Sequence, residues 1–285
     1  APYTTWLLHR LDAGFCDVPN PFSGKPYRVS LRPDDVALFT FWTKNPVPLV
    51  DPVRIMKERG FRVALFITVT GYPRHIERNV PEPGTIATAV SRLAGMLGTD
   101  ALWWRYDPVI FSRKLDESWH MANFESLCSS IWNGNSRRVT FSLAHLDGPY
   151  RRARAALESA LLSDGDMLEI PPFRSPGYDA LYERTLSLLS SLSAIARSYR
   201  IPDAEVCCSP RLKTGETRIA QGRCLDLDRI RRLVPDLGKV PAAPTRRGIS
   251  MHANGYADCG CVKSVDIGTN GTCPHGCVYC YANRR

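Results

Sequence analysis

Three cysteines near the carboxyl end form the pattern in this chain that is best suited to chemistry. Cys273, Cys277 and Cys280 stand at C-x3-C-x2-C spacing in "GTCPHGCVYCYANRR", and Tyr279 directly precedes the third cysteine. Thiolates at this spacing can bind zinc or an iron–sulfur cluster. The sequence therefore predicts a metal centre near the carboxyl end.

Four uses of this motif can be compared. A structural zinc ion needs four ligands, and Cys259 or Cys261 with His275 could complete the set. A ferredoxin-type electron carrier needs four thiolates to hold its cluster. A disulfide is typical of oxidising compartments and does not suit a cytosolic protein. In the fourth use, three cysteines hold a [4Fe–4S] cluster whose open iron binds S-adenosylmethionine (SAM), and reduction releases a 5′-deoxyadenosyl radical. The spacing, with Tyr279 in place, favours the fourth use, and zinc is the main alternative.

Composition narrows the class of protein. The chain has 285 residues, 44% of them hydrophobic, and ten cysteines. It is too long to need disulfides for stability, and it opens with no export signal. No apolar run is long enough to span a bilayer. We therefore expect a cytoplasmic protein without membrane spans, in which Cys16 and Cys128 are buried as small apolar residues.

The charge permits an anionic partner without identifying one. Lys and Arg exceed Asp and Glu by 37 to 28, a formal net charge of +9. The basic residues are scattered, and no stripe of interleaved aromatic residues is present. Nucleic acid remains a possible partner, and a solvated basic surface is the alternative.

Segments of strand length alternate with segments of helical length. Strands are predicted at 36–42, 62–70, 101–111, 137–146, 204–209 and 261–268. Helices are predicted at 49–60, 84–98, 116–132, 149–163 and 178–200. This alternation predicts an α/β fold with a mainly parallel sheet: a single domain over 1–285, closed partly or fully into a (β/α) TIM-like barrel. Its cysteine-rich end, 259–285, carries the cluster loop after the last strand.

Several motifs together resemble a known group of proteins. They are "SVDIGTNGTCPHGCVYCYANR", "FWTKNP", "TVTGY", "WRYDPV" and "GRCLD". The chain resembles, over nearly its whole length, the bacterial radical SAM group catalogued as domain of unknown function 1848, which is distantly similar to spore photoproduct lyase. In that superfamily the cysteine loop usually follows the first barrel strand. Here it follows the last, so the resemblance implies a circularly permuted radical SAM topology.

The resemblance also implies roles for residues at two strand ends. Lys44 and Asn45 would face the cofactor or substrate, and so would Arg105 and Asp107. Tyr279 could lie against the adenine of SAM or simply pack. Arg105 and Asp107 are two apart on a strand, so they could instead form a structural ion pair.

A second set of cysteines has matching positions in the same group. They are Cys208, Cys224, Cys259 and Cys261. Four further thiolates suit a second iron–sulfur cluster or a zinc ion, and inert thiols are the alternative. Cys207, next to Cys208 on a strand, is expected to point the opposite way and to pack.

These observations predict a radical SAM enzyme that abstracts hydrogen from a small molecule, a nucleotide or a nucleic acid lesion. Its partners would include an electron donor such as flavodoxin or ferredoxin. The alternative is a non-enzymatic nucleic-acid-binding protein stabilised by zinc or an iron–sulfur cluster.

Overall fold

A six-stranded parallel sheet forms the centre of the molecule. The computed structural model describes residues 3–20, 23–207, 219–237, 261–262, 264–269 and 271–282. The strand order follows the chain, β3-β4-β5-β6-β7-β8. The strands are β3 (Phe39–Thr43), β4 (Val63–Thr68), β5 (Leu102–Val109), β6 (Arg138–Leu143), β7 (Asp203–Cys207) and β8 (Ala220–Gly222). Because every neighbour is parallel, all six carboxyl ends meet at one edge.

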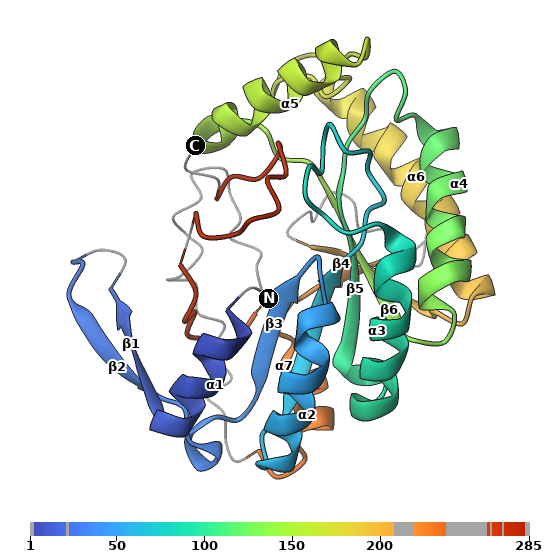
Figure 1. Ribbon diagram of the computed structural model, residues 1–285. Coiled ribbons are helices and arrows are strands. Elements are labelled where there is room, and N and C mark those ends of the chain that lie inside the picture. The colour runs from blue at the N-terminus through green and yellow to red at the C-terminus, as the bar shows by residue number, and fades with distance from the viewer. Residues whose placement is uncertain are drawn as a thin grey trace.

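Helices connect the strands and cover the sheet. They are α2 (Val50–Glu58), α3 (Pro83–Leu97), α4 (Glu117–Leu127), α5 (Arg151–Ser163), α6 (Tyr178–Ser198) and α7 (Leu227–Leu233). Short helical turns are η1 (Pro33–Asp35), η2 (Val47–Leu49), η3 (Thr99–Ala101), the π-turn η4 (Cys128–Trp132) and η5 (Gly148–Tyr150). Figure 1 shows α2 and α3 beside the front strands, with α4 and α6 side by side at the right.

Burial explains why these segments become strands and helices. In β4 five of six residues are buried, which is typical of a parallel strand covered on both faces. In α3 the buried residues Ile86, Ala89, Val90 and Leu93 recur at helical spacing and form one apolar face. Asp116 caps α4 by accepting a 2.8 Å hydrogen bond from the Trp119 N–H.

The predicted alternation is confirmed for five of the six strands and for all five helices. The exception is the strand expected at 261–268. In its described part, 261–262 and 264–268, no residue is in a strand, and the last strand of the sheet in the described residues is the short β8. Polar Ser264 and Asp266 and exposed Val265 explain this, because the segment presents no buried face to a neighbouring strand.

The amino-terminal elements were not predicted. Helix α1 (Thr4–Ala13) precedes an antiparallel hairpin of β1 (Phe15–Pro19) and β2 (Pro26–Ser30), which projects to the left in Figure 1. Cys16 in β1 and Cys128 in η4 are both buried, at 1% and 0% exposure, as predicted. Within the described residues, no helix is long and apolar enough to cross a membrane.

Candidate functional site

The cysteine-rich end of the chain lies against the loop that follows β4. An antiparallel bridge pairs Glu77 with Cys277. On either side, the Asn79 N–H donates to the His275 carbonyl at 2.9 Å, and the Val278 N–H donates to the Ile76 carbonyl at 3.0 Å. In Figure 1 the described end of the chain (red) lies beyond the carboxyl ends of the front strands. Backbone pairing across about 200 positions of sequence thus brings the motif to the edge of the sheet where α/β proteins place their sites.

The three motif thiols occupy different depths. Cys273 is exposed, Cys280 is half-buried, and Cys277 is 6% exposed. Burial raises the pKa of Cys277 to about 12; the charge of Lys44 opposes this, and the thiols of Cys280 and Cys273 add to it. The motif thiols thus lie in one region of the fold but differ in access to solvent.

The donor set fits an iron–sulfur cluster or a zinc ion chemically. The backbone turns tightly between the ligands, with Gly276 at φ +64° and a 3.1 Å bond from the Cys280 N–H to the Cys277 carbonyl. Across the described ranges, no three His, Cys, Asp or Glu side chains are already arranged as a finished metal site. The thiols would converge on binding and lose their protons.

Next to Cys277 a buried polar network joins three segments. Lys44, directly after β3, forms a 2.8 Å ion pair with Glu77 and lies 3.3 Å from the Thr70 hydroxyl. The Thr70 hydroxyl donates to Glu77 at 2.6 Å, and the Tyr279 hydroxyl donates to the same carboxylate. Glu77 is only 3% exposed, so its charge is balanced almost wholly by these partners. A small open pocket is lined by Lys44, Thr70, Glu77 and their neighbours.

Glu77 is the residue in this region that the sequence analysis missed. It lies in a turn-rich loop, and its partners are 7, 33 and 202 positions away in sequence. A glutamate close after "TVTGY" was the one available signal, and it is a weak signal.

The predicted residues after β3 have different surroundings. The Lys44 ammonium lies 5.7 Å from the centre of the Tyr279 ring, beside the motif. Asn45 shapes the turn: its N–H donates to the Thr43 hydroxyl at 3.0 Å, and its side chain accepts from the Val47 N–H at 3.1 Å. The ring centres of Tyr279 and Tyr72 are 6.2 Å apart, and the Tyr279 hydroxyl donates a hydrogen bond to the Glu77 carboxylate. Contacts of these residues with SAM or a substrate stay predictions.

Arg105 and Asp107 form an ion pair at the carboxyl half of β5. Their side chains are 18% and 16% exposed, and the Ser142 hydroxyl also donates to Asp107. Burial alone would lower the pKa of Arg105, but Asp107, with Cys224 and Cys207, raises it above the ordinary value. The structural ion pair is therefore present, and binding of a ligand by the same two groups is untested.

The predicted second cysteine set is described only at Cys224 and Cys261, which are in hydrogen-bonding contact. Cys208 and Cys259 lie outside the described residues. Cys207 was expected to pack away from the set, and this is wrong: its Sγ lies 3.4 Å from Cys224 Sγ. Hydrogen bonds with Cys207 and Cys261 hold the pKa of Cys224 well below its usual range, although burial opposes them. Arg105 and Arg138 act in the same direction. Cys224 lies in irregular chain after β8, and its side chain contacts Cys207 at the end of β7. The alternation of side chains along a strand does not predict this contact.

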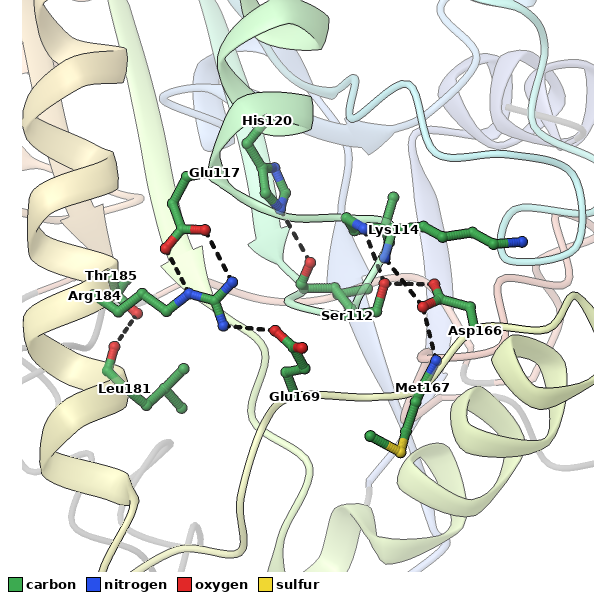
Figure 2. Close-up of polar contacts among 12 residues, drawn as sticks. Ser112, Lys114, Glu117, His120, Asp166, Met167, Glu169, Leu181, Arg184 and Thr185 are labelled. Atoms are coloured by element: carbon green, nitrogen blue, oxygen red, sulfur yellow. Dashed lines mark hydrogen bonds and ion pairs between the residues drawn. The ribbon is translucent and has the colours of Figure 1, made fainter.

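A network of buried and half-buried polar side chains supports the loops after β5. Figure 2 shows Arg184 between Glu117 and Glu169, and Ser112 beside Asp166. The Arg184 guanidinium donates to Glu117 at 2.5 Å and to Glu169 at 2.8 Å, and the Ser112 hydroxyl donates to Asp166 at 2.5 Å. These bonds join α4 and α6 to the loop 164–170.

Glycine is required at one position of this support. Gly71 has φ +68°, and a Cβ there would lie 2.3 Å from the Asn123 Oδ1. Asn123 in turn donates to the Thr70 carbonyl at 2.8 Å and to the Tyr106 hydroxyl at 3.0 Å. Thr70 and Gly71, the "TG" of "TVTGY", therefore hold the chain after β4 in the position where the Thr70 hydroxyl contacts Glu77.

His120 in this network is expected to make stability depend on pH. Its ring is fully buried and bonded to the Tyr106 hydroxyl and the Ile110 carbonyl. Burial lowers its pKa from 6.5 to about 4, although Glu117 and Asp116 oppose this. As the pH falls from 6.5 toward 4 the unfolded chain takes up the proton first, so up to about 3 kcal/mol of stability is lost in that window.

Urea unfolding at pH 7.5 and pH 4.5 measures this effect. His120→Gln keeps a donor and an acceptor but has no titrating group, and should show a weaker pH dependence. Exposed His9→Gln is the control and should behave as the parent. If the free energy of unfolding changed equally between the two pH values in the parent and in His120→Gln, His120 would not be the source of the pH dependence.

The structure thus presents a parallel α/β sheet with a C-x3-C-x2-C segment bound at the carboxyl ends of its strands. The family model described as "Domain of unknown function (DUF1848)" matches residues 1–282, so the chain belongs to that family. Comparisons with curated proteins and with solved structures gave no significant match.

Proposed function

We propose that this protein is a radical SAM enzyme in which Cys273, Cys277 and Cys280 hold a [4Fe–4S] cluster. One observation carries the proposal: a three-thiol motif with an adjacent tyrosine is paired to the loop after β4, beside Lys44. Three cysteines leave one iron of such a cluster for SAM. When bound, the reduced cluster supplies the electron that cleaves SAM to a 5′-deoxyadenosyl radical.

The surrounding residues have distinct roles in this proposal. Glu77 holds Lys44 and Tyr279 beside the ligand loop, and the Lys44 ammonium offsets negative charge on the cluster and its thiolates. Arg105 and Asp107 provide a cation and an anion for the carboxylate and amine of SAM or for a polar substrate. Tyr72 and Tyr279 provide apolar cover that limits access of water.

The same proposal includes the topology and the partners. The sheet would form a partial barrel of permuted radical SAM type, because a segment from the end of the chain lies next to the ends of the first two strands. An oxygen-sensitive cluster and ten cysteines suit the reducing cytoplasm. An electron donor such as flavodoxin or ferredoxin would reduce the cluster. The substrate would be a small molecule or a nucleotide, and the net charge of +9 would favour an anionic one.

Anaerobic reconstitution tests the proposal. After incubation with iron and sulfide, the protein should be brown and should form 5′-deoxyadenosine from SAM when dithionite is added. Protein that loads iron and sulfide normally but neither binds nor cleaves SAM would sink the enzyme proposal. Colourless protein carrying zinc at Cys273, Cys277 and Cys280 would instead favour the non-enzymatic alternative.

A further inference from the structure

Three thiols gather at the carboxyl ends of β7 and β8, the last two strands in the order of the sheet. Cys207 ends β7, Cys224 follows β8, and Cys261 comes from the segment that leads toward the carboxyl end. The Sγ atoms of Cys207 and Cys224 are 3.4 Å apart, and Cys261 is in hydrogen-bonding contact with Cys224. No disulfide forms among the eight described cysteines. The described residues contain no ready-made group of three metal-ligating side chains, so this trio would have to close around an ion as it binds.

The separation of Cys207 and Cys224 can be compared with the sulfur–sulfur distances in known kinds of centre. Zinc–sulfur bonds of about 2.3 Å at tetrahedral angles place neighbouring sulfurs about 3.8 Å apart. A [4Fe–4S] cluster binds each thiolate to a separate iron, so its cysteine sulfurs lie much further apart. A disulfide needs about 2.05 Å. The observed separation is that of a thiol–thiol hydrogen bond, and among the centres compared it is closest to that of two ligands on one tetrahedral ion.

The backbone around the trio brings these sulfurs together. Gly222 lets β8 lie close to β7, because a Cβ there would meet the Glu205 side chain at 3.0 Å. The Leu225 N–H donates to Cys261 Sγ at 3.3 Å, a bond that stabilises a sulfur carrying negative charge.

We propose that Cys207, Cys224 and Cys261 are three ligands of a single tetrahedral, zinc-type metal ion, separate from the centre at Cys273, Cys277 and Cys280. Binding replaces three thiol protons, which pass to the solvent, and involves no change in oxidation state. The fourth position belongs to a ligand outside this trio. The ion ties β7, the chain after β8 and the segment at Cys261 together, and this proposal does not depend on radical SAM activity.

A triple variant, Cys273→Ala with Cys277→Ala and Cys280→Ala, isolates this centre in the full-length chain. Purified anaerobically with Zn²⁺, it should retain about one zinc per chain, measured by mass spectrometry of metals. Titration with Co²⁺ should produce thiolate-to-cobalt charge-transfer bands and the intense visible bands of tetrahedral cobalt. If the triple variant bound no zinc and showed no such cobalt bands, the proposal would be overturned. In this measurement Cys207, Cys224 and Cys261 themselves remain unchanged.

Further substitutions in that background assign the ligands. Cys207→Ser, Cys224→Ser and Cys261→Ser, each made separately, should lower zinc from about one per chain to below about 0.1. Buried Cys16→Ala should leave it unchanged. Zinc retained in all three serine variants, a disulfide found between Cys207 and Cys224, or iron and sulfide bound at this trio would each overturn the proposal.

Discussion

Replacing Cys277 by alanine is expected to abolish both cluster loading and SAM cleavage. The thiol is a proposed ligand on the strand-like segment that pairs with the loop after β4, and its neighbours offer no substitute sulfur at the same depth. Iron bound at this motif should fall from about four per chain to near zero, and 5′-deoxyadenosine formation should fall by roughly 100-fold or more. Iron and sulfide analysis with a chromatographic assay of the nucleoside measures both. Cys273→Ala and Cys280→Ala should behave alike.

Buried Cys128→Ala is the matched control, because it removes a fully buried thiol outside both cysteine sets. It should retain the cluster and the activity, with at most a small loss of stability. Normal iron content in all three motif variants would rule out Cys273, Cys277 and Cys280 as the ligand set.

The second large effect is on stability, when Glu77 is replaced by leucine. Lys44 would then be left as an ammonium, 13% exposed, beside the Thr70 and Tyr279 hydroxyls without their shared acceptor. Removing one partner of a buried ion pair typically costs about 3–5 kcal/mol. Urea unfolding of metal-free protein measures the loss. Amide exchange should also accelerate at Val278, whose N–H is bonded to Ile76.

A double substitution separates the ion pair from general packing. Lys44→Met with Glu77→Leu removes both charges, so it should be more stable than Glu77→Leu alone. The exposed pair Arg54–Glu58 provides the control, and Glu58→Gln should change stability by less than about 1 kcal/mol. If Glu77→Leu lowers the free energy of unfolding no more than Glu58→Gln does, Glu77 does not hold Lys44 and Tyr279 in place.

Much of the fold was predictable because it depends on local patterns. Apolar runs such as "VALFIT" indicate strands buried on both faces, and the spacing of Ile86, Val90 and Leu93 indicates a helix with one apolar face. The hairpin β1–β2 was not predicted, since exposed residues such as Tyr27 and Arg28 give β2 a weak pattern. The prediction of a strand at 261–268 was wrong for the opposite reason. The local sequence pattern is typical of a strand, but none of the described residues of this segment pairs with a strand of the sheet.

The sequence by itself determined the type of chemistry at the carboxyl end. Three cysteines at fixed spacing next to a tyrosine restrict the candidates to metal centres, because ligand spacing is a local property. It also determined that the Arg105 and Asp107 side chains share one face of a strand.

Only the tertiary structure decided what lies around those residues. The antiparallel pairing of Cys277 with Glu77 joins positions 200 apart, and Glu77 has no local pattern that marks it as an anchor. The approach of Cys207 to Cys224 depends on how closely β8 lies against β7 at Gly222. Such contacts are set by which surfaces the folded chain brings together, and neither the period of a strand nor the spacing of a motif contains that information.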